Sequence, residues 1–250
     1  MTATLTHIVR HPLKAIGREV CERVNLTAGQ WMPGDRIWAV THGKSRIEGP
    51  GWAPKVNFLR GVSGPSLMAA TAHLSEDGAS LTLNHPEAGP LTLHPDNPDD
   101  TPRLLHWLGG IWPEDLPPPT GLYRTDAAHL TDVPDPWLSI HNAATHRAVE
   151  QRLDTPLSIH RWRGNLWIEG LAPWQEFEWI GKTIRIGAVA FTIRERITRC
   201  KATMANPETG RRDADTLAAL RSWDHQDFGV YAEVLSDGAI ATGDPVEVPQ

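Results

Sequence analysis

The sequence predicts a mainly β fold with a few short helices, built as a barrel or a sandwich. Short runs of β-branched and apolar residues recur along the chain, and turn residues separate them at a spacing of about 8–12 residues. One such turn, Asp77-Gly78, favours a tight hairpin and joins predicted strands at 66–73 and 79–83. The chain of 250 residues is long enough for one large all-β domain or for two smaller ones.

The first half of the chain is predicted to hold strands and little helix. Alternating or compact apolar segments place these strands at 3–9, 18–26, 37–41, 66–73, 79–83 and 89–94. A short helix is predicted at 103–109, where it would end at a pair of glycines. Residues 113–120 hold four prolines and two acidic residues, so this segment is the best candidate for a domain boundary.

The second half is predicted to alternate strands with two helices. Asn142 is a plausible N-cap for a helix over 143–153, which is rich in good helix formers. Residues 215–223 form a second, shorter helix, capped by Asp213 or Asp215. The predicted strands lie at 138–140, 157–163, 165–168, 179–187, 188–193, 228–235 and 243–248.

Composition excludes several classes of protein. The net charge of −6 argues against a general nucleic-acid or membrane-surface binder, so any anion site must come from a local cluster of arginines. Two distant cysteines make no disulfide framework, which favours a reducing compartment. With neither a secretory signal nor a long apolar run, the sequence predicts a cytoplasmic protein. The 11 tryptophans are interpreted as core and loop packing.

The most informative stretch is 191–210, which places one of the two cysteines among cations. Cys200 follows a predicted strand and lies close to Arg194, Arg196, Arg199 and Lys201. Nearby positive charge favours the thiolate, which attacks electrophiles and binds soft metals. The alternative is that Cys200 is a small buried hydrophobe, as free cysteines commonly are. Core packing is the expected role of Cys21.

Other candidate residues carry weaker signals. Arg163 offers a bidentate fork for phosphate or another oxyanion, and Asn165 offers both a donor and an acceptor. Lys14 is interpreted either as a solvated lysine or as a cation that contacts a ligand. His7 and His11 are interpreted as surface histidines, because Pro12 opposes a helix that would pair them. Dinucleotide, Walker-type and Cys-x-x-Cys patterns do not occur.

At these residues the chain resembles the MOSC family, which are molybdenum-cofactor sulfurase C-terminal-type proteins. The most specific match is 198–203 with 206–210, Thr-Arg-Cys-Lys-Ala-Thr and Asn-Pro-Glu-Thr-Gly, which resemble Ser-Arg-Cys-x-x-Thr and Asp-Pro-x-Thr-Gly. Weaker matches lie at 11–14 (His-Pro-Leu-Lys), 34–38 (Gly-Asp-Arg-Ile-Trp), 161–165 (Arg-Trp-Arg-Gly-Asn), 179–182, 184–187, 228–231 and 243–246.

The resemblance implies an N-terminal β-barrel domain at 1–115 and a MOSC β-barrel domain at 116–250. It makes Cys200 the reactive residue and a thiolate ligand to molybdenum. The cofactor would be molybdopterin. The residues that would contact the pterin, its phosphate or the substrate are Lys14, His141, Asn142, Arg163, Asn165, Thr198 and Arg199.

Two classes of function follow from the resemblance. The first is a molybdenum oxidoreductase that reduces small N-hydroxylated or N-oxygenated compounds and takes electrons from a separate donor protein, since the chain has no motif of its own for an electron carrier. The second is a persulfide carrier or cofactor-handling protein without turnover. A β-barrel binding module with a buried cysteine is a third possibility.

Three departures from the family pattern bear on the site. Ala15 replaces the usual serine after the lysine, and Asn206 replaces an aspartate. Val62 stands where the family has an arginine, and Arg60 would share its face only if this segment were a strand.

Overall fold

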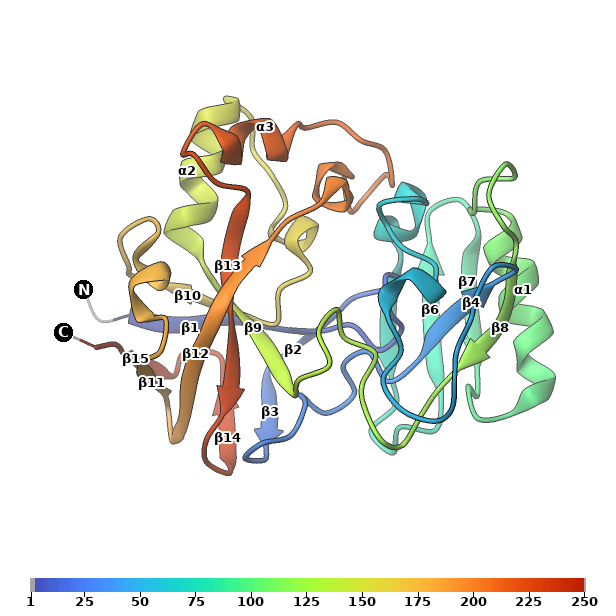
Figure 1. Ribbon diagram of the computed structural model, residues 1–250, viewed down its shortest axis with the longest axis horizontal. Helices are drawn as coiled ribbons and strands as arrows, with labels where there is room; N and C mark the ends of the chain where they lie inside the picture. Colours follow the sequence, from blue (N-terminus) through green and yellow to red (C-terminus); the bar gives the residue numbers. More distant parts are fainter. Residues whose placement is uncertain (1–2, 250) are drawn as a thin grey trace.

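The computed structural model describes residues 3–249, and it confirms a mainly β fold with three short α-helices. The helices are α1 (Thr101–Gly109), α2 (Ala143–Leu153) and α3 (Thr216–Arg221). Figure 1 shows two units side by side, a barrel with α2 and α3 at one end and a smaller unit that carries α1. None of the helices in residues 3–249 is long and apolar enough to cross a membrane.

A closed barrel of seven strands forms the larger unit. Around it run β10-β9-β13-β12-β11-β15-β1, and β1 pairs back with β10 to close the ring. The eighth strand of this sheet, β2 (Glu19–Cys21), is attached to β1 outside the ring. The ring strands are β1 (Ala3–Arg10), β9 (Trp137–Asn142), β10 (Leu166–Glu169), β11 (Thr183–Ile186), β12 (Val189–Thr198), β13 (Asp227–Val234) and β15 (Pro245–Glu247).

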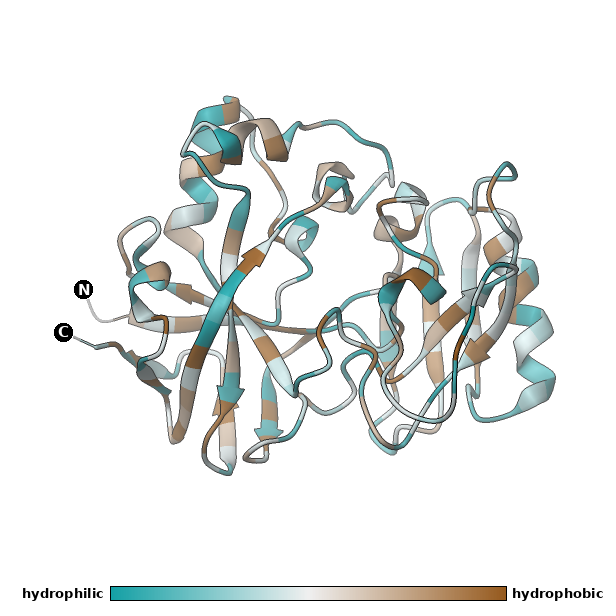
Figure 2. Cartoon of the chain, in the orientation of Figure 1, coloured by the Kyte–Doolittle hydropathy of each residue, from teal (hydrophilic) through white to brown (hydrophobic). Residues whose placement is uncertain are grey.

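The alternation of apolar residues explains why these segments line a barrel. In β12, Val189, Phe191 and Ile193 are buried at every second position, as a strand with one inward face requires. The pattern then changes to charged residues at 194–196, and Figure 2 shows this part of β12 as hydrophilic. The polar half of β12 carries the chain out of the barrel core toward Cys200.

The smaller unit has its own hydrophobic core, built around Trp38, Leu67, Leu83, Leu104 and Leu108. It contains a three-stranded sheet, a two-stranded pair and helix α1. The strands are β5 (Thr71–Leu74), β6 (Leu81–His85), β7 (Gly89–Leu93), and the pair β4 (Ala39–His42) with β8 (Pro119–Tyr123). A further pair, β3 (Arg23–Leu26) with β14 (Gly238–Ala241), packs on the barrel core.

The division of the chain into two domains at 115/116 stays a prediction. The strand pairing shows that the first strand lies in the same barrel as the strands of the second half. Strand β1 pairs with β10 and β15, so residues 3–10 belong to the same ring as the C-terminal strands. The chain therefore starts in the barrel, crosses to the smaller unit and returns to the barrel after β8, through residues 124–136.

Several predicted elements differ from the structure for local reasons. The predicted strand at 66–73 begins with the 3-10 helix η2 (Pro65–Ala69), because Pro65 occupies the first helical turn and favours its backbone angle. The predicted strand at 157–163 is largely the 3-10 helix η4 (Ile159–Trp162), whose start is capped by the Ser158 side chain. Further 3-10 turns are η1 (Lys55–Asn57), η3 (Pro98–Asp100) and η5 (Gln175–Trp179).

Candidate functional site

Cys200 lies just past the end of β12, as the sequence predicts, and its side chain is exposed. It precedes the 3-10 helix η6 (Lys201–Met204), and its backbone carbonyl accepts hydrogen bonds from the amide and the hydroxyl of Thr203 at 3.2 and 3.1 Å. The residue is thus fixed by its backbone while its sulfur can be reached from solvent. This exposure contradicts the interpretation of Cys200 as a small buried hydrophobe.

Two of the four cations near Cys200 in sequence are engaged elsewhere. Arg194 forms an ion pair with Glu233, and Arg196 lies over the Phe177 ring at 4.3 Å. Lys201 is exposed. Arg199, whose charge interacts with Cys200, and the exposed Lys201 are therefore the two remaining cations next to the thiol.

Arg199 is held in place by backbone carbonyls. Its Nε and Nη2 donate to the carbonyl of Phe228 at 2.8 and 2.5 Å, and its Nη1 donates to that of Trp162 at 2.8 Å. Burial lowers the pKa of Arg199 to about 10, and it stays a cation at neutral pH. With no carboxylate paired to it among residues 3–249, its charge is available to an anion near Cys200.

His141 supports Arg199 from inside the barrel. Its ring is fully buried, stacks between Trp167 and Phe228 with centroids 4.9 and 5.5 Å away, and places Nε2 3.4 Å from Nη2 of Arg199. Burial, and after it the charge of Arg199, lowers the pKa of His141 well below its usual range. The imidazole is therefore neutral at neutral pH. Because His141 is fully buried, its observed role is to contact Arg199 and not a ligand.

Arg163 carries a buried donor that has no partner. The residue has a left-handed backbone at the end of η4, and its Nη1 donates to the carbonyl of Gly17 at 3.2 Å. Its Nη2 is covered and hydrogen-bonds to nothing in residues 3–249. Burial, and then the charge of Arg36, lowers the pKa of Arg163 to about 9. A buried cation with an unused donor favours an anionic ligand.

Two residues that the sequence analysis did not select, Arg36 and Asp132, contact the predicted site residues. Arg36 donates to the backbone carbonyl of Arg163 at 3.0 Å and forms an ion pair with Asp35. Burial alone would raise the pKa of Asp35, but the Arg36 guanidinium holds it well below its usual range. In the sequence, the Gly34-Asp35-Arg36 turn stands out only as part of a family pattern, and this is the one signal that could have identified Arg36.

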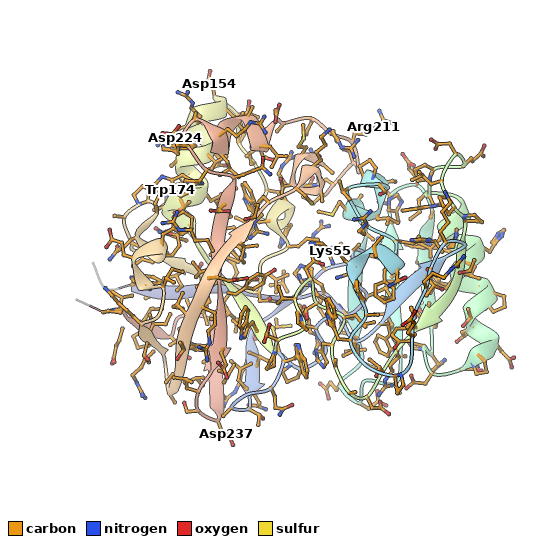
Figure 3. The ribbon with its side chains drawn as sticks, in the orientation of Figure 1. Lys55, Asp154, Trp174, Arg211, Asp224 and Asp237 are labelled. Atoms are coloured by element: carbon orange, nitrogen blue, oxygen red, sulfur yellow. The ribbon has the colours of Figure 1, made fainter. Side chains whose placement is uncertain are left out.

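Lys14 is buried and faces the other missed residue, Asp132. Its Nζ donates to the carbonyl of Leu130 at 2.8 Å and to Oδ1 of Asp132 at 2.6 Å. Burial lowers the pKa of Lys14, and Asp132 opposes that shift. Nζ of Lys55 lies 3.4 Å from Oδ2 of the same aspartate, and Figure 3 shows Lys55 where the two units face each other. Lys14 is therefore an interior cation, not a solvated one.

Three other predicted site residues use their side chains within the protein. Asn142 caps α2 by accepting from the amide of Ala144, and its amide group donates to Ala172 and Glu176. Asn165 accepts from the amide and hydroxyl of Ser139 and donates to the carbonyl of Val9. Thr198 is exposed and donates to Asp227 at 2.7 Å. Only Thr198 is placed where it could exchange its partner for a ligand.

The interpretation of His11 as a surface residue is wrong, whereas His7 is exposed as predicted. The amide of His11 donates to Oδ1 of Asp35 at 2.7 Å, and its Nδ1 lies 3.3 Å from the same oxygen. Its surroundings, first burial and then the charges of Arg163 and Arg36, hold the pKa of His11 well below its usual range. The aspartate that holds it inside lies 24 residues further along the chain, beyond the reach of local pattern.

Glu176, which Asn142 contacts, predicts a measurable dependence of stability on pH. Burial raises its pKa, although Asn142 and Thr145 donate to Oε2 at 2.8 and 3.0 Å. At pH values between the unfolded and the folded pKa, Glu176 therefore keeps a proton in the folded protein that it has lost in the unfolded chain. Stability is full below the unfolded pKa and falls as pH rises toward the folded pKa, by about 1.4 kcal/mol for each pH unit that separates the two pKa values. Glu176→Gln should flatten this decline in urea unfolding at pH 5 and pH 8, and an unchanged slope would contradict the assignment.

The residues fit a polyanionic cofactor better than a bare metal ion. Lys14, Arg36, Arg163 and Arg199 are interior or half-buried cations, and within residues 3–249 the carboxylates that form ion pairs with them are Asp35 and Asp132. Among residues 3–249 there is no cluster of three or more His, Cys, Asp or Glu side chains that could hold a metal. A metal near Cys200 would therefore arrive with other ligands, as it does in molybdopterin, where a dithiolene holds it and a phosphate offers oxygens to arginine.

Arg60 does not replace the family arginine in the way the strand pattern suggested. Residues 61–63 form a turn, not a strand, so the alternation that would place Arg60 and position 62 on one face is absent. The carbonyl of Val62 instead accepts from Nη2 of Arg212 at 2.7 Å. Gly61 adjoins η6, since a Cβ on it would lie 3.5 Å from that of Ala202.

The part of the chain that holds Cys200 and most of the barrel strands matches a known family, the MOSC domain. The model of the MOSC domain matches residues 128–247, and this part of the chain is a MOSC domain. A molybdenum cofactor sulfurase of Caenorhabditis briggsae is 29% identical over 100 residues, which are 38% of this chain and 14% of the relative. One of Anopheles gambiae is 32% identical over 83 residues, 32% of this chain and 10% of the relative. The matches thus span only a small part of these sulfurases.

Two solved structures are similar to this chain at low sequence identity. The YuaD protein of Bacillus subtilis is 12% identical with a TM-score of 0.46, covering 99% of this chain and 95% of that one. YiiM of Geobacillus stearothermophilus is 16% identical with a TM-score of 0.36, covering 45% and 54% of the two chains.

Proposed function

We propose that this protein binds a molybdenum cofactor and reduces small N-oxygenated compounds, with Cys200 as a thiolate ligand to the metal. The observation that carries the proposal is the exposed Cys200 beside Arg199, with the unused donor of Arg163 in the same cluster of cations. The sulfurase relatives support a function connected with the molybdenum cofactor.

The proposed roles follow from what each side chain can reach. Arg163 would donate its free Nη2 to an oxyanion of the cofactor, and Arg36 would keep Arg163 oriented through its carbonyl. Arg199 would stabilise negative charge at the sulfur, while neutral His141 keeps the guanidinium in place. The bound cofactor would supply the two-electron chemistry, removing the oxygen of an N–OH group as water. A separate donor protein would supply the electrons.

A second candidate is a carrier that holds sulfur on Cys200 as a persulfide. The same exposed thiol favours it, and so do the sulfurase names of the relatives. Mass spectrometry separates the two: a sulfur adduct on Cys200 together with absence of molybdenum would favour the carrier.

Arg163→Met is expected to lower the cofactor content of the purified protein about tenfold or more. The change removes a charged donor from a buried place, and a charge-assisted hydrogen bond of this kind contributes about 1.5–3 kcal/mol. The measurement is molybdenum per chain by elemental analysis, together with pterin content after oxidation. Arg152→Met, on the exposed end of α2, is the matched control. Equal molybdenum content in the two variants would contradict the role of Arg163.

A further inference from the structure

A cavity of about 670 Å³ lies in the smaller unit, and neither Cys200 nor the residues around Arg163 line it. Its apolar lining includes Ile47, Trp52, Val56, Phe58, Trp112 and Leu116. Phe58 and Ile47 belong to a small packed cluster with Leu130, so this side of the cavity is fixed. The volume falls in the range of about 300–1,000 Å³ that is typical of sites for small organic ligands.

The walls of the cavity are tied together by hydrogen bonds. The hydroxyl of Ser45 donates to the carbonyl of Asn57 at 2.6 Å, and Oδ1 of Asn57 accepts from the amide of Arg46 at 2.6 Å. At the far end of the same loop, Tyr123 donates to the carbonyl of Gly51 at 3.1 Å. A ligand would therefore meet a preformed site and need little ordering of the loop.

The two tryptophans offer apolar rings to this space, because their polar atoms are used elsewhere. Nε1 of Trp52 donates to the carbonyl of Thr131 at 3.0 Å, and Nε1 of Trp112 donates to the carbonyl of Pro117 at 3.1 Å. Val56 is 60% exposed, which is unusual for a large aliphatic side chain that lines a cavity. A flat apolar body would cover these surfaces.

The charged residues of the cavity favour an anion. Lys44, Arg46 and Arg60 line it together with a single acid, Glu48. Within residues 3–249, neither Lys44 nor Arg60 has a carboxylate within ion-pair distance, and Arg60 is half-buried. An arginine fork without a carboxylate partner suits a ligand carboxylate.

We propose that this cavity is a binding site for planar aromatic carboxylates, with the ring system against Trp52 and Trp112 and the carboxylate on Arg60. Lys44 adds a second positive charge, and Glu48 weakens binding by repulsion. The site goes beyond the proposed reductase function, because binding requires neither Cys200 nor a cofactor. The cavity nevertheless lies near the Cys200 site, since Gly61, next to Arg60, packs against Ala202 of η6, the 3-10 helix that follows Cys200.

The test is calorimetric titration of the 250-residue protein with 2-naphthoate and with its neutral counterpart 2-naphthamide. The carboxylate should bind about tenfold more tightly, as expected for one charge-assisted contact. Arg60→Gln should remove this preference, and Glu48→Gln should strengthen carboxylate binding. Arg152→Gln, remote from the cavity, should leave both affinities unchanged. The opposite signs at positions 60 and 48 exclude unfolding as the explanation.

Four results would overturn the proposal. Equal affinity for the carboxylate and the amide would show that the cations play no part. Retention of the preference in Arg60→Gln would place the anion elsewhere. Loss of naphthoate binding in Cys200→Ser, or its displacement when the cofactor is loaded, would show that no separate site exists. Normal naphthoate binding by Cys200→Ser, even if the protein contains no molybdenum, would support the cavity independently of the proposed function.

Discussion

Replacing Cys200 by serine is expected to abolish reduction of amidoximes and hydroxylamines, by at least about a thousandfold in kcat/KM. The serine hydroxyl is neutral at pH 7 and is a hard oxygen donor, whereas the proposed metal site requires a soft thiolate. Cys200 is exposed and its backbone is held by Thr203, so the exchange of sulfur for oxygen should leave the fold unchanged. The measurement is substrate reduction with a chemical electron donor.

Cys21→Ser is the matched control for this loss of activity. Cys21 lies in β2, half-buried, and burial raises the pKa of its thiol, which makes it a poor nucleophile at neutral pH. The variant should keep its activity within about twofold. Reductase activity that survives in Cys200→Ser, or that disappears in Cys21→Ser at unchanged thermal stability, would contradict the assignment of the reactive sulfur.

Gly164→Ala is expected to destabilise the protein by about 2–3 kcal/mol, the cost of forcing a methyl group into a packed core. A Cβ at this position would lie 1.9 Å from Cδ2 of His141, whose ring is fixed between Trp167 and Phe228. Neither aromatic wall can yield without opening the core beneath α2 and α3. The measurement is the free energy of unfolding in urea.

The opposite edge of the same ring is closed by Gly229. A Cβ there would lie 2.2 Å from Nδ1 of His141, and the φ of 75° adds left-handed strain of about 1 kcal/mol. Gly181→Ala separates the two costs, because its φ of 78° is similar and nothing lies within 4 Å of the added Cβ.

A double-mutant cycle tests the stated cause. If the clash with His141 is responsible, His141→Ala combined with Gly164→Ala should cost less than the sum of the single changes. Additive costs, or a Gly164→Ala variant as stable as the parent, would show that the histidine is not wedged between the two glycines.

The parts of the fold that were predicted from sequence depend on short-range signals. Asn142 does cap the helix at 143–153, because its side chain accepts from an amide only two residues away. Cys200 does follow a strand, because the alternation in 189–193 involves neighbours along one segment. The mainly β class followed from many such local patterns taken together.

The parts that were not predicted depend on contacts between distant segments. The pairing of β1 with β10 and β15 joins residues more than 150 positions apart, and no periodicity in either strand indicates it. Asp132 lies in a loop with no motif, yet it is the counter-ion of Lys14. Asn165 has a residue type suited to ligand binding, but Ser139 and Val9 occupy its side chain.

The most direct test of the central claim is X-ray absorption at the molybdenum edge, comparing the parent protein with Cys200→Ser after purification from cells that make the cofactor. If Cys200 binds the metal, the parent should contain about one molybdenum per chain, with one more sulfur neighbour than the variant. Identical sulfur shells in the two proteins, or a parent protein free of molybdenum that carries sulfur on Cys200, would contradict the account.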